Sequence, residues 1–399
     1  MDASQTQSQL LKSGGVLMRR LTFFLAIAAC GFAQALHMSP APNPSVAGSI
    51  QPNWGVAADG SALLSWVEAA KGGGYALRYA VRKGADWTEA RTIATGRRFW
   101  RHPAEVPEII SLSDGTLMAH WVENGKESTE AEFIFVSTSR DGVHWSEPQM
   151  AHRDRSPVQH GLASMIASGP QEASIFWLQA LKGEDGPVSL MRTVVGADGK
   201  EIREEQLDPD VCSCCPTSVA KTAKGLLVAY RGHTPKDIRD INVIRFENGK
   251  WTPSKVLNPD KWEINACPVN AASAAAKDNR VAISWYTEAN ETPRVQVAFS
   301  SDGGATFTKP VVVSTKETQG YASTALNGDG GAYVSWIEEG EKSASVMVRL
   351  VSPAGVPGPV LKVAEGSRQS LGYPKLSRPG GETWIAWGDK TGVKTAQLK

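Results

Sequence analysis

The stretch Leu63-Leu64-Ser65-Trp66, an apolar strand that closes on an aromatic residue, is the first of seven such stretches in the chain. The aromatic residue recurs every 51 to 56 positions, at Trp121, Trp177, Tyr230, Trp285, Trp336 and Trp387. A repeat of this length with short β-strands in each unit is typical of propeller blades. The sequence therefore predicts an all-β fold, a β-propeller of seven four-stranded blades. The alternative is six blades, with one terminal unit as an accessory hairpin.

The fifth repeat shows the plan of one blade. Its four strands are expected near Cys267–Ala274, Val281–Tyr286, Val295–Phe299 and Lys309–Val313. Val, Ile and aromatic residues in these strands suit a half-buried pleated surface, and the Asp- and Gly-containing segments between them suit tight turns. No segment shows a sustained helical period, so the mature chain is predicted to be all-β.

The last repeat is incomplete. It begins near Leu371 and has room for only three strands before Lys399. A propeller can complete such a blade with a strand from the other end of the chain, which leaves only short, protected sheet edges. We therefore expect residues of about Val46–Ile50 to form the missing outer strand.

The N-terminal residues resemble an export leader. Residues 1–35 are assigned to it, with a true start at Met18, because Arg19-Arg20 precede an apolar run that is too short for a membrane span. Cleavage after Ala35 and lipidation of Cys30 are both compatible with the sequence. Residues 36–48 would then be a tether and residues 49–399 the propeller. The protein is expected in the periplasm, the cell envelope or the medium, touching a membrane only through a possible lipid anchor.

The composition narrows the range of partners. Lys and Arg number 42 against 41 Asp and Glu, a net charge of +1, so no nucleic-acid partner is expected. The apolar content of 41% is sufficient for one large core. We expect a monomer without a cofactor.

Four cysteines remain once Cys30 is set aside. They are Cys212, Cys214, Cys215 and Cys267. Cys215 and Cys267 precede corresponding inner strands in adjacent blades, so these thiols can meet near the channel. In an exported protein, cysteines are first interpreted as disulfides, and we expect one bond between Cys267 and the other three. The alternative is a metal site made by the four cysteines with His160.

Two turns carry a family resemblance. Ser300-Ser301-Asp302-Gly303-Gly304-Ala305-Thr306-Phe307 resembles the Asp-box (BNR repeat) of sialidase-like propellers, and residues 139–145 resemble a shorter version. The cysteines and Cys267-Pro268-Val269-Asn270 resemble a bacterial exported subgroup of that family. The resemblance implies a propeller fold and, if sialidase chemistry is kept, an arginine triad, an Asp acid/base and a Tyr nucleophile.

The catalytic pattern of true sialidases is not matched. Their first arginine lies in Arg-Ile-Pro, whereas this chain has Ser49-Ile50-Gln51-Pro52. The catalytic residues therefore stay unknown; the candidates are Tyr321, Tyr373, Asp237 and Asp240. Further carboxylates that could perform acid/base work are Glu105, Glu108 and Glu263.

Polar residues at the expected channel mouth indicate ligand binding. The set is Arg231, His233, Arg239, His160 and Glu108. Because arginine binds carboxylates bidentately, the set favours a glycan or a small anionic ligand. The predicted function is an exported propeller that binds such a ligand at the channel mouth. The alternatives are an exo-glycosidase of sialidase type and a metal- or redox-linked envelope protein, and whether the protein is an enzyme is left open.

Overall fold

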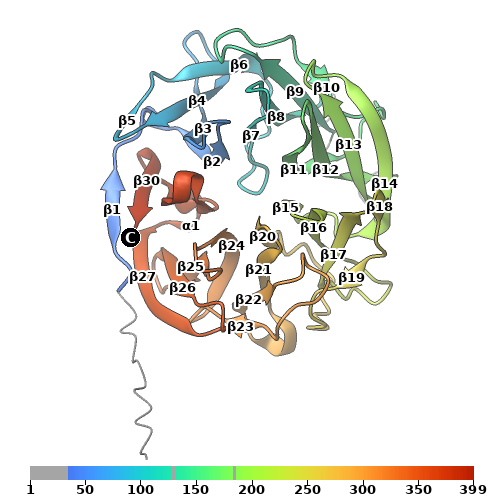
Figure 1. The fold of residues 1–399 in the computed structure, drawn as a ribbon, viewed down its shortest axis with the longest axis vertical. Helices are drawn as coiled ribbons and strands as arrows, with labels where there is room; N and C mark the ends of the chain where they lie inside the picture. The colour runs from blue at the N-terminus through green and yellow to red at the C-terminus, as the bar shows by residue number, and fades with distance from the viewer. Residues whose placement is uncertain (1–34, 127–130, 183–185) are drawn as a thin grey trace, which may run out of the picture. The chain divides into compact units, whose positions relative to one another are not determined.

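The computed structural model describes residues 35–126, 131–182 and 186–399. Within them, Ala35–Lys399 forms one compact unit in which seven antiparallel sheets surround a central axis (Figure 1). The prediction of a seven-bladed all-β propeller is confirmed.

The first four blades follow the chain order. Strands are given from the inner strand outward. Blade one has β2 (Ile50–Val56), β3 (Ala62–Ala69) and β4 (Tyr75–Lys83), with β5 (Asp86–Trp87) and β6 (Arg91–Arg97) both paired to β4, and blade two has β7 (Glu108–Ser111), β8 (Leu117–Asn124), β9 (Glu132–Ser139) and β10 (Gln149–Met150). Blade three has β11 (His160–Gly169), β12 (Glu172–Ala180), β13 (Val188–Gly196) and β14 (Glu201–Val211), and blade four has β15 (Ser218–Thr222), β16 (Gly225–Arg231) and β17 (Ile241–Glu247), with β18 (Lys250–Trp251) and β19 (Lys255–Val256) both paired to β17.

The last three blades complete the ring. Blade five has β20 (Ser273–Lys277), β21 (Arg280–Thr287), β22 (Arg294–Ser300) and β23 (Val311–Val312). Blade six has β24 (Thr318–Leu326), β25 (Ala332–Glu339), β26 (Ala344–Val351) and β27 (Pro357–Gly366). Blade seven has β28 (Lys375–Ser377), β29 (Thr383–Asp389), β30 (Gly392–Leu398) and β1 (Met38–Ala41). Short helical turns are η1 (Ala289–Glu291), α1 (Arg368–Leu371) and η2 (Pro379–Gly381).

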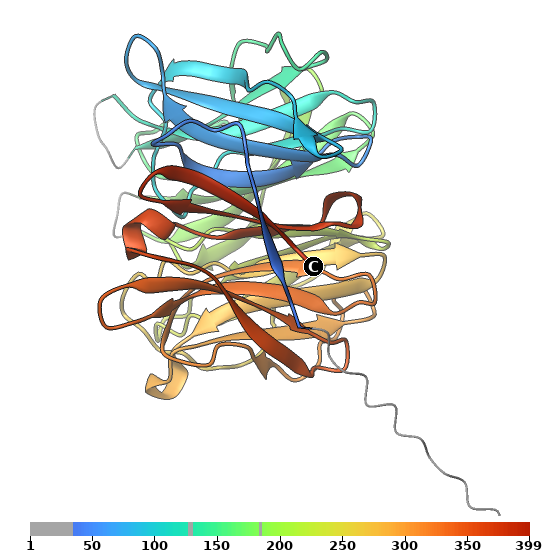
Figure 2. The ribbon, with the colours of Figure 1, turned by 90° about the vertical axis from the view of Figure 1, so that its left-hand side faces the viewer.

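An N-terminal strand closes the ring, but the predicted segment was wrong. β1 pairs with β30 from Met38 opposite Leu398 to Ala41 opposite Thr395, and Figure 2 shows it in blue beside the red last blade. The closing strand thus lies inside the predicted tether. Ile50 instead opens β2, the inner strand of the first blade, so the Val46–Ile50 segment cannot also be an outer strand.

The repeated aromatic residues fill the spaces between blades. Trp66, Trp121 and Trp336 are fully buried in the interiors of second strands, each of which continues for three residues beyond its tryptophan. Each donates its indole N–H to a glutamate two residues on, at Glu68, Glu123 and Glu338. Side chains two apart lie on the same face of a strand, so the spacing satisfies a buried donor within the strand itself.

The Asp-box-like turns are closed by their own side chains. The Oδ1 atom of Asp302 accepts the backbone N–H groups of Ala305 and Thr306, and Ser300 Oγ accepts that of Gly304. Such bonds hold the backbone in the turn, so this motif is structural. Within the described residues, no helix is long and apolar enough to cross a membrane.

Inner strands begin with a repeated irregularity. Gln51, Leu162 and Tyr321 have positive φ angles of 53°, 56° and 55°, and the pairing register shifts beside each of them. The distortion frees backbone N–H groups from the sheet ladder. Some of these groups then bond side chains of the preceding blade, and this arrangement shapes the site described next.

Candidate functional site at the channel mouth

A pocket of 380 Å³ opens between blades two and five, where the inner strands begin. Its wall includes Trp100, His102, Glu132, Gln159, Cys214 and Cys267. We call it the mouth pocket. A separate cavity of 740 Å³ follows the central channel and is lined by inner strands, including Glu108 and Lys375.

Of two buried carboxyl groups in this region, Glu132 lines the mouth pocket and Glu105 lies next to its wall, bonded to the backbone of Leu162. Glu105 Oε2 accepts the backbone N–H groups of Leu162 and Ala163, while its Oε1 atom has no partner. Glu132, at the start of β9, has an unpartnered Oε2 atom. Both groups approach Gly161: a Cβ atom there would lie 2.9 Å from Glu132 Oε2 and 3.4 Å from Glu105 Oε2. Glycine is therefore the residue that leaves room for this pair.

Burial makes both carboxyl groups weak acids. It raises the pKa of Glu105 to about 8 and the pKa of Glu132 to about 8. The charge of Glu132 adds to the increase for Glu105, whereas His120 opposes it. At neutral pH each group is mainly protonated, so the pair can donate as well as accept hydrogen bonds.

An aromatic pair forms another part of the wall. The rings of Trp100 and His102 stack with centroids 4.9 Å apart. Gln51 Nε2 holds their loop by donating to the carbonyl oxygens of Trp100, His102 and Glu105. The His102 Nδ1 atom accepts the Ala104 N–H, and burial lowers the pKa of His102. The pair is therefore an uncharged, half-buried platform.

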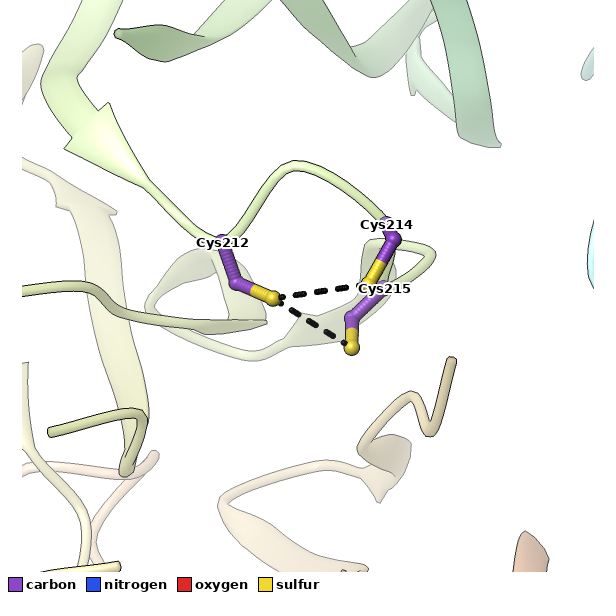
Figure 3. A group of neighbouring side chains, drawn as sticks. All are labelled: Cys212, Cys214 and Cys215. Atoms are coloured by element: carbon purple, nitrogen blue, oxygen red, sulfur yellow. Dashed lines mark hydrogen bonds between the residues drawn. The ribbon is translucent and has the colours of Figure 1, made fainter. Parts of the chain in front are cut away.

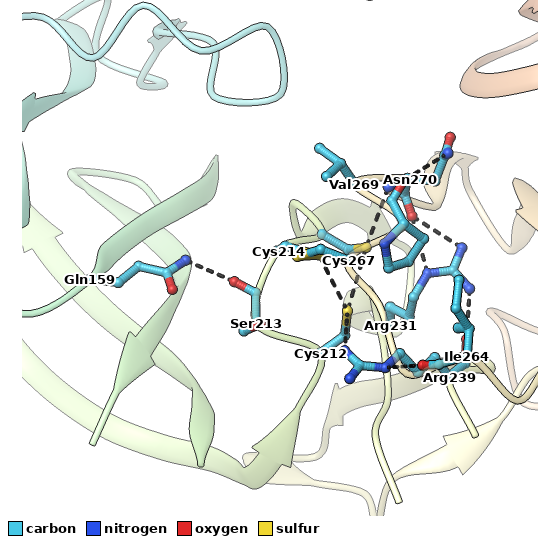
Figure 4. The surroundings of a disulfide bond; sticks show 12 residues. Gln159, Cys212, Ser213, Cys214, Arg231, Arg239, Ile264, Cys267, Val269 and Asn270 are labelled. Carbon is cyan, nitrogen blue, oxygen red and sulfur yellow. Dashed lines mark hydrogen bonds between the residues drawn. A yellow bond between two sulfur atoms is a disulfide. The ribbon is translucent and has the colours of Figure 1, made fainter. Parts of the chain in front are cut away.

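The predicted disulfide is present. Cys214 is bonded to Cys267, with Cα atoms 5.9 Å apart, and it joins the loops of blades four and five at the pocket wall (Figure 4). Gln159 Nε2 donates to Ser213 O at 2.9 Å and ties this loop to blade three. Cys212 and Cys215 are free and buried.

The two thiols differ electrostatically. The hydrogen bond between them lowers the pKa of Cys212 to about 5, and the nearby Arg231 and Arg239 act in the same direction. Burial raises the pKa of Cys215 well above its usual value.

Arg231 lies inside the protein wall. It is 2% exposed, and its guanidinium donates to the carbonyl oxygens of Asn270, Tyr286 and Arg239. Its hydrogen bonds hold blades four and five together. This geometry gives Arg231 a structural role. Its guanidinium has no free face for the ligand that the sequence predicts it to bind.

Arg239, His233, Asp237 and Asp240 of that loop are also paired. Arg239 contacts Ile264 O at 3.0 Å, Asp237 Oδ1 at 3.1 Å and Cys212 Sγ at 3.4 Å. His233 lies between Asp210 and Asp237, at 2.7 Å and 3.3 Å. Asp240 accepts the N–H groups of two residues in the following loop, Lys261 and Trp262.

His160 and Glu108 lie apart from this loop. His160 is fully buried and stacks on His152 with centroids 4.1 Å apart. Among the described residues, the sulfur group that could hold a metal contains Cys212, Cys214 and Cys215 and does not include His160. Glu108 Oε2 accepts the Met165 N–H at 2.6 Å and faces the channel cavity.

The two candidate tyrosines pack on each other. The rings of Tyr321 and Tyr373 lie 4.0 Å apart. The Tyr373 hydroxyl donates to Val269 O, and burial raises the pKa of Tyr373 well above its usual value. A tyrosine held as a neutral donor is poorly suited to act as a nucleophile.

Sequence reasoning missed Glu132, which lines the mouth pocket. Glu132 is one acidic residue among 41, on a strand whose neighbours give no motif. Its importance depends on Gly161, a residue of another blade, so only the fold brings the two together.

No protein-family model and no curated protein matches the sequence. Among solved structures, a protein of unknown function from Dyadobacter fermentans is 14% identical, with a TM-score of 0.50 over 92% of this chain and 99% of that chain. A neuraminidase-like protein of A/little yellow-shouldered bat/Guatemala is 9% identical (TM-score 0.49; 92% and 99% covered). The Aleuria aurantia lectin is 14% identical (TM-score 0.42; 81% and 97% covered). At such identities only the fold is shared, and the class defined here is the β-propeller.

Proposed function

We propose that the protein is a glycan-binding propeller whose ligand occupies the mouth pocket. The observation that carries the proposal is the combination of an uncharged aromatic pair, Trp100 and His102, with the carboxyl group of Glu132, which lines the same pocket and keeps an unpaired buried oxygen. Glu105, directly behind Gly161, keeps a second one. Binding pockets typically combine apolar walls with a few convergent polar groups. A buried polar atom without a partner is costly in the free protein, and a ligand hydroxyl would supply the missing bond.

A sugar ring matches this chemistry. Its C–H face can pack on an aromatic ring, while its hydroxyl groups both donate and accept hydrogen bonds. Because Glu105 and Glu132 are mainly neutral below about pH 8, they do not repel a glycan that carries a carboxylate. The Cys214–Cys267 disulfide supports a location in an oxidising compartment. The leader, the Cys30 lipidation site and their cleavage lie outside the described residues.

The test is a glycan array followed by calorimetric titration with the glycan it selects. Trp100→Ala should weaken binding at least tenfold, because the platform is removed. Trp145→Ala is the matched control, since this tryptophan packs on Tyr79 and is absent from the mouth pocket wall. Equal binding by both variants and the unchanged protein would contradict the proposal.

A glycoside hydrolase is the second candidate. A carboxylic acid with a pKa near 8 is protonated at neutral pH and can serve as a general acid. If the protein hydrolyses the selected glycan, Glu132→Gln should abolish turnover while leaving binding largely intact. Sialoside hydrolysis that depends on Tyr321 or Tyr373 would restore sialidase chemistry.

A further inference from the structure

The free thiols of Cys212 and Cys215 form a compact sulfur group beside the mouth pocket. Their Sγ atoms lie 3.6 Å apart, and Cys214 Sγ lies 3.8 Å from Cys212 Sγ (Figure 3). All three sulfur atoms lie within 4.8 Å of one another. Cys212 and Cys215 are each 1% exposed, so the group is shielded from water.

The backbone and the disulfide hold this group in place. The Cys212 N–H donates to Arg231 O at 3.0 Å, which fixes the start of the loop to β16. The bond from Cys214 to Cys267 fixes its middle to blade five. The Asn270 N–H donates to Cys215 Sγ at 3.3 Å. The two free thiols are therefore preorganised without a ligand.

The contacts around the sulfur atoms are donors. Arg239 Nη1 lies 3.4 Å from Cys212 Sγ, and the Arg231 guanidinium, bonded to the Asn270 carbonyl, is a second nearby positive charge (Figure 4). Hydrogen bonds of this kind stabilise a metal-bound thiolate. Because Arg and N–H groups cannot act as ligands here, the donor set among the described residues is sulfur alone.

We propose that Cys212 and Cys215 bind one Cu(I) ion, with the Cys214 sulfur on its third side. Soft thiolate ligands select Cu(I), whereas a structural Zn²⁺ site requires four ligands and the described residues offer only two free thiols. With metal–sulfur distances of roughly 2.3 Å, an ion can reach both sulfur atoms without moving them apart. Binding releases the thiol protons and changes no oxidation state, so the Cys214–Cys267 bond stays intact.

This proposal does not depend on glycan binding. The metal site expected from the sequence consists of four cysteines and His160, whereas the site proposed here has two thiols, because Cys267 is used in the disulfide and His160 packs on His152.

The experiment is an anaerobic Cu(I) titration of the full chain against a chromophoric Cu(I) chelator. All proteins carry Cys30→Ser to remove the remaining cysteine of the chain, and mass spectrometry first verifies the Cys214–Cys267 bond. We expect one Cu(I) per chain, at least 100-fold weaker binding in both Cys212→Ser and Cys215→Ser, and no stoichiometric Zn²⁺ binding. Ser213→Ala is the matched control, since it changes the same loop without removing a sulfur atom.

X-ray absorption of the copper-loaded Cys30→Ser protein, with Cys212 and Cys215 intact, keeps the proposal testable if a further variant fails to fold. Two or three sulfur neighbours and no nitrogen neighbour would support it. A copper ion bound by nitrogen or oxygen, binding unchanged in both serine variants, or no Cu(I) uptake by protein with two titratable thiols would each overturn it.

Discussion

The Arg231 loop and the Glu105 loop are both rich in charge and both lie at the mouth of the ring, yet they differ in how their polar atoms are used. In the first, Arg231 donates hydrogen bonds to three carbonyl groups, and Arg239 is paired with Asp237. In the second, Glu105 and Glu132 each keep a buried oxygen without a partner. The difference teaches that a fully bonded charged cluster belongs to the architecture, whereas incomplete bonding beside a pocket indicates a binding site.

The largest expected effect is on stability, in Arg231→Ala. The substitution leaves the Asn270, Tyr286 and Arg239 carbonyl groups without their donor inside the protein. We expect a loss of about 4 kcal/mol in the free energy of unfolding, measured by chemical denaturation. Arg203→Ala, at an exposed position of β14, should change it by less than about 0.5 kcal/mol. A stable Arg231→Ala protein that no longer binds glycan would return this residue to the site.

Cys267→Ser should have the next largest effect. It removes the cross-link between the loops of blades four and five, whose loss we expect to cost about 3 kcal/mol. Thermal unfolding with and without a reductant measures it: the unchanged protein should lose stability on reduction and the variant should not. Equal sensitivity of the two proteins to reductant would show that the bond is not formed in solution.

Glu105→Gln should alter the pH dependence of stability. The pKa of Glu105 in the folded state, about 8, lies above the ordinary glutamate value of 4.5 that applies in the unfolded chain, so the folded protein binds the proton more tightly. Glu105 therefore costs nothing below about pH 4.5 and destabilises the fold increasingly as the pH rises toward 8.

Glutamine keeps an oxygen for the Leu162 and Ala163 N–H groups but carries no charge. The variant should gain roughly 3 kcal/mol relative to the unchanged protein between pH 5 and pH 8. Denaturation at both pH values measures this gain, and the exposed Glu382→Gln serves as the control. A gain that is absent, or larger at pH 5, would show that Glu105 is ionised in the folded state.

The smallest effect is expected for Asp237→Ala. Its contacts with His233 and Arg239 are partly exposed to solvent, where ion pairs contribute little. The free energy of unfolding should fall by less than about 1 kcal/mol, and glycan affinity should not change. Loss of glycan binding in this variant would place the ligand at the Arg231 loop. It would contradict the assignment of that loop to the architecture and of the Glu105 loop to binding.

The fold was predictable because the repeat is carried by local sequence. The buried Trp66, Trp121 and Trp336 need the same strand pattern in every blade, so the period is visible without coordinates. β1 was not predictable in this way. Met38-Ser39-Pro40-Ala41 has no alternating pattern, and it is a strand only because the edge of β30 offers partners.

The site was predictable only in part. The disulfide was predictable because the cysteines precede corresponding inner strands of adjacent blades. The same correspondence explains why Cys215 lies near Asn270 in the structure. The role of Arg231 could not be deduced, since an arginine that binds carbonyl groups and one that binds a ligand look alike in sequence. Glu105 and Glu132 belong to the same blade but lie far apart in sequence, and both approach Gly161 of the next blade, a contact that only the fold reveals.

The most direct test of the central claim is a crystal structure of the protein with the glycan selected on the array. The account predicts a sugar ring on Trp100, with hydroxyl groups within hydrogen-bonding distance of Glu132. A glycan bound instead at Arg239 and His233, with the mouth pocket empty, would contradict it.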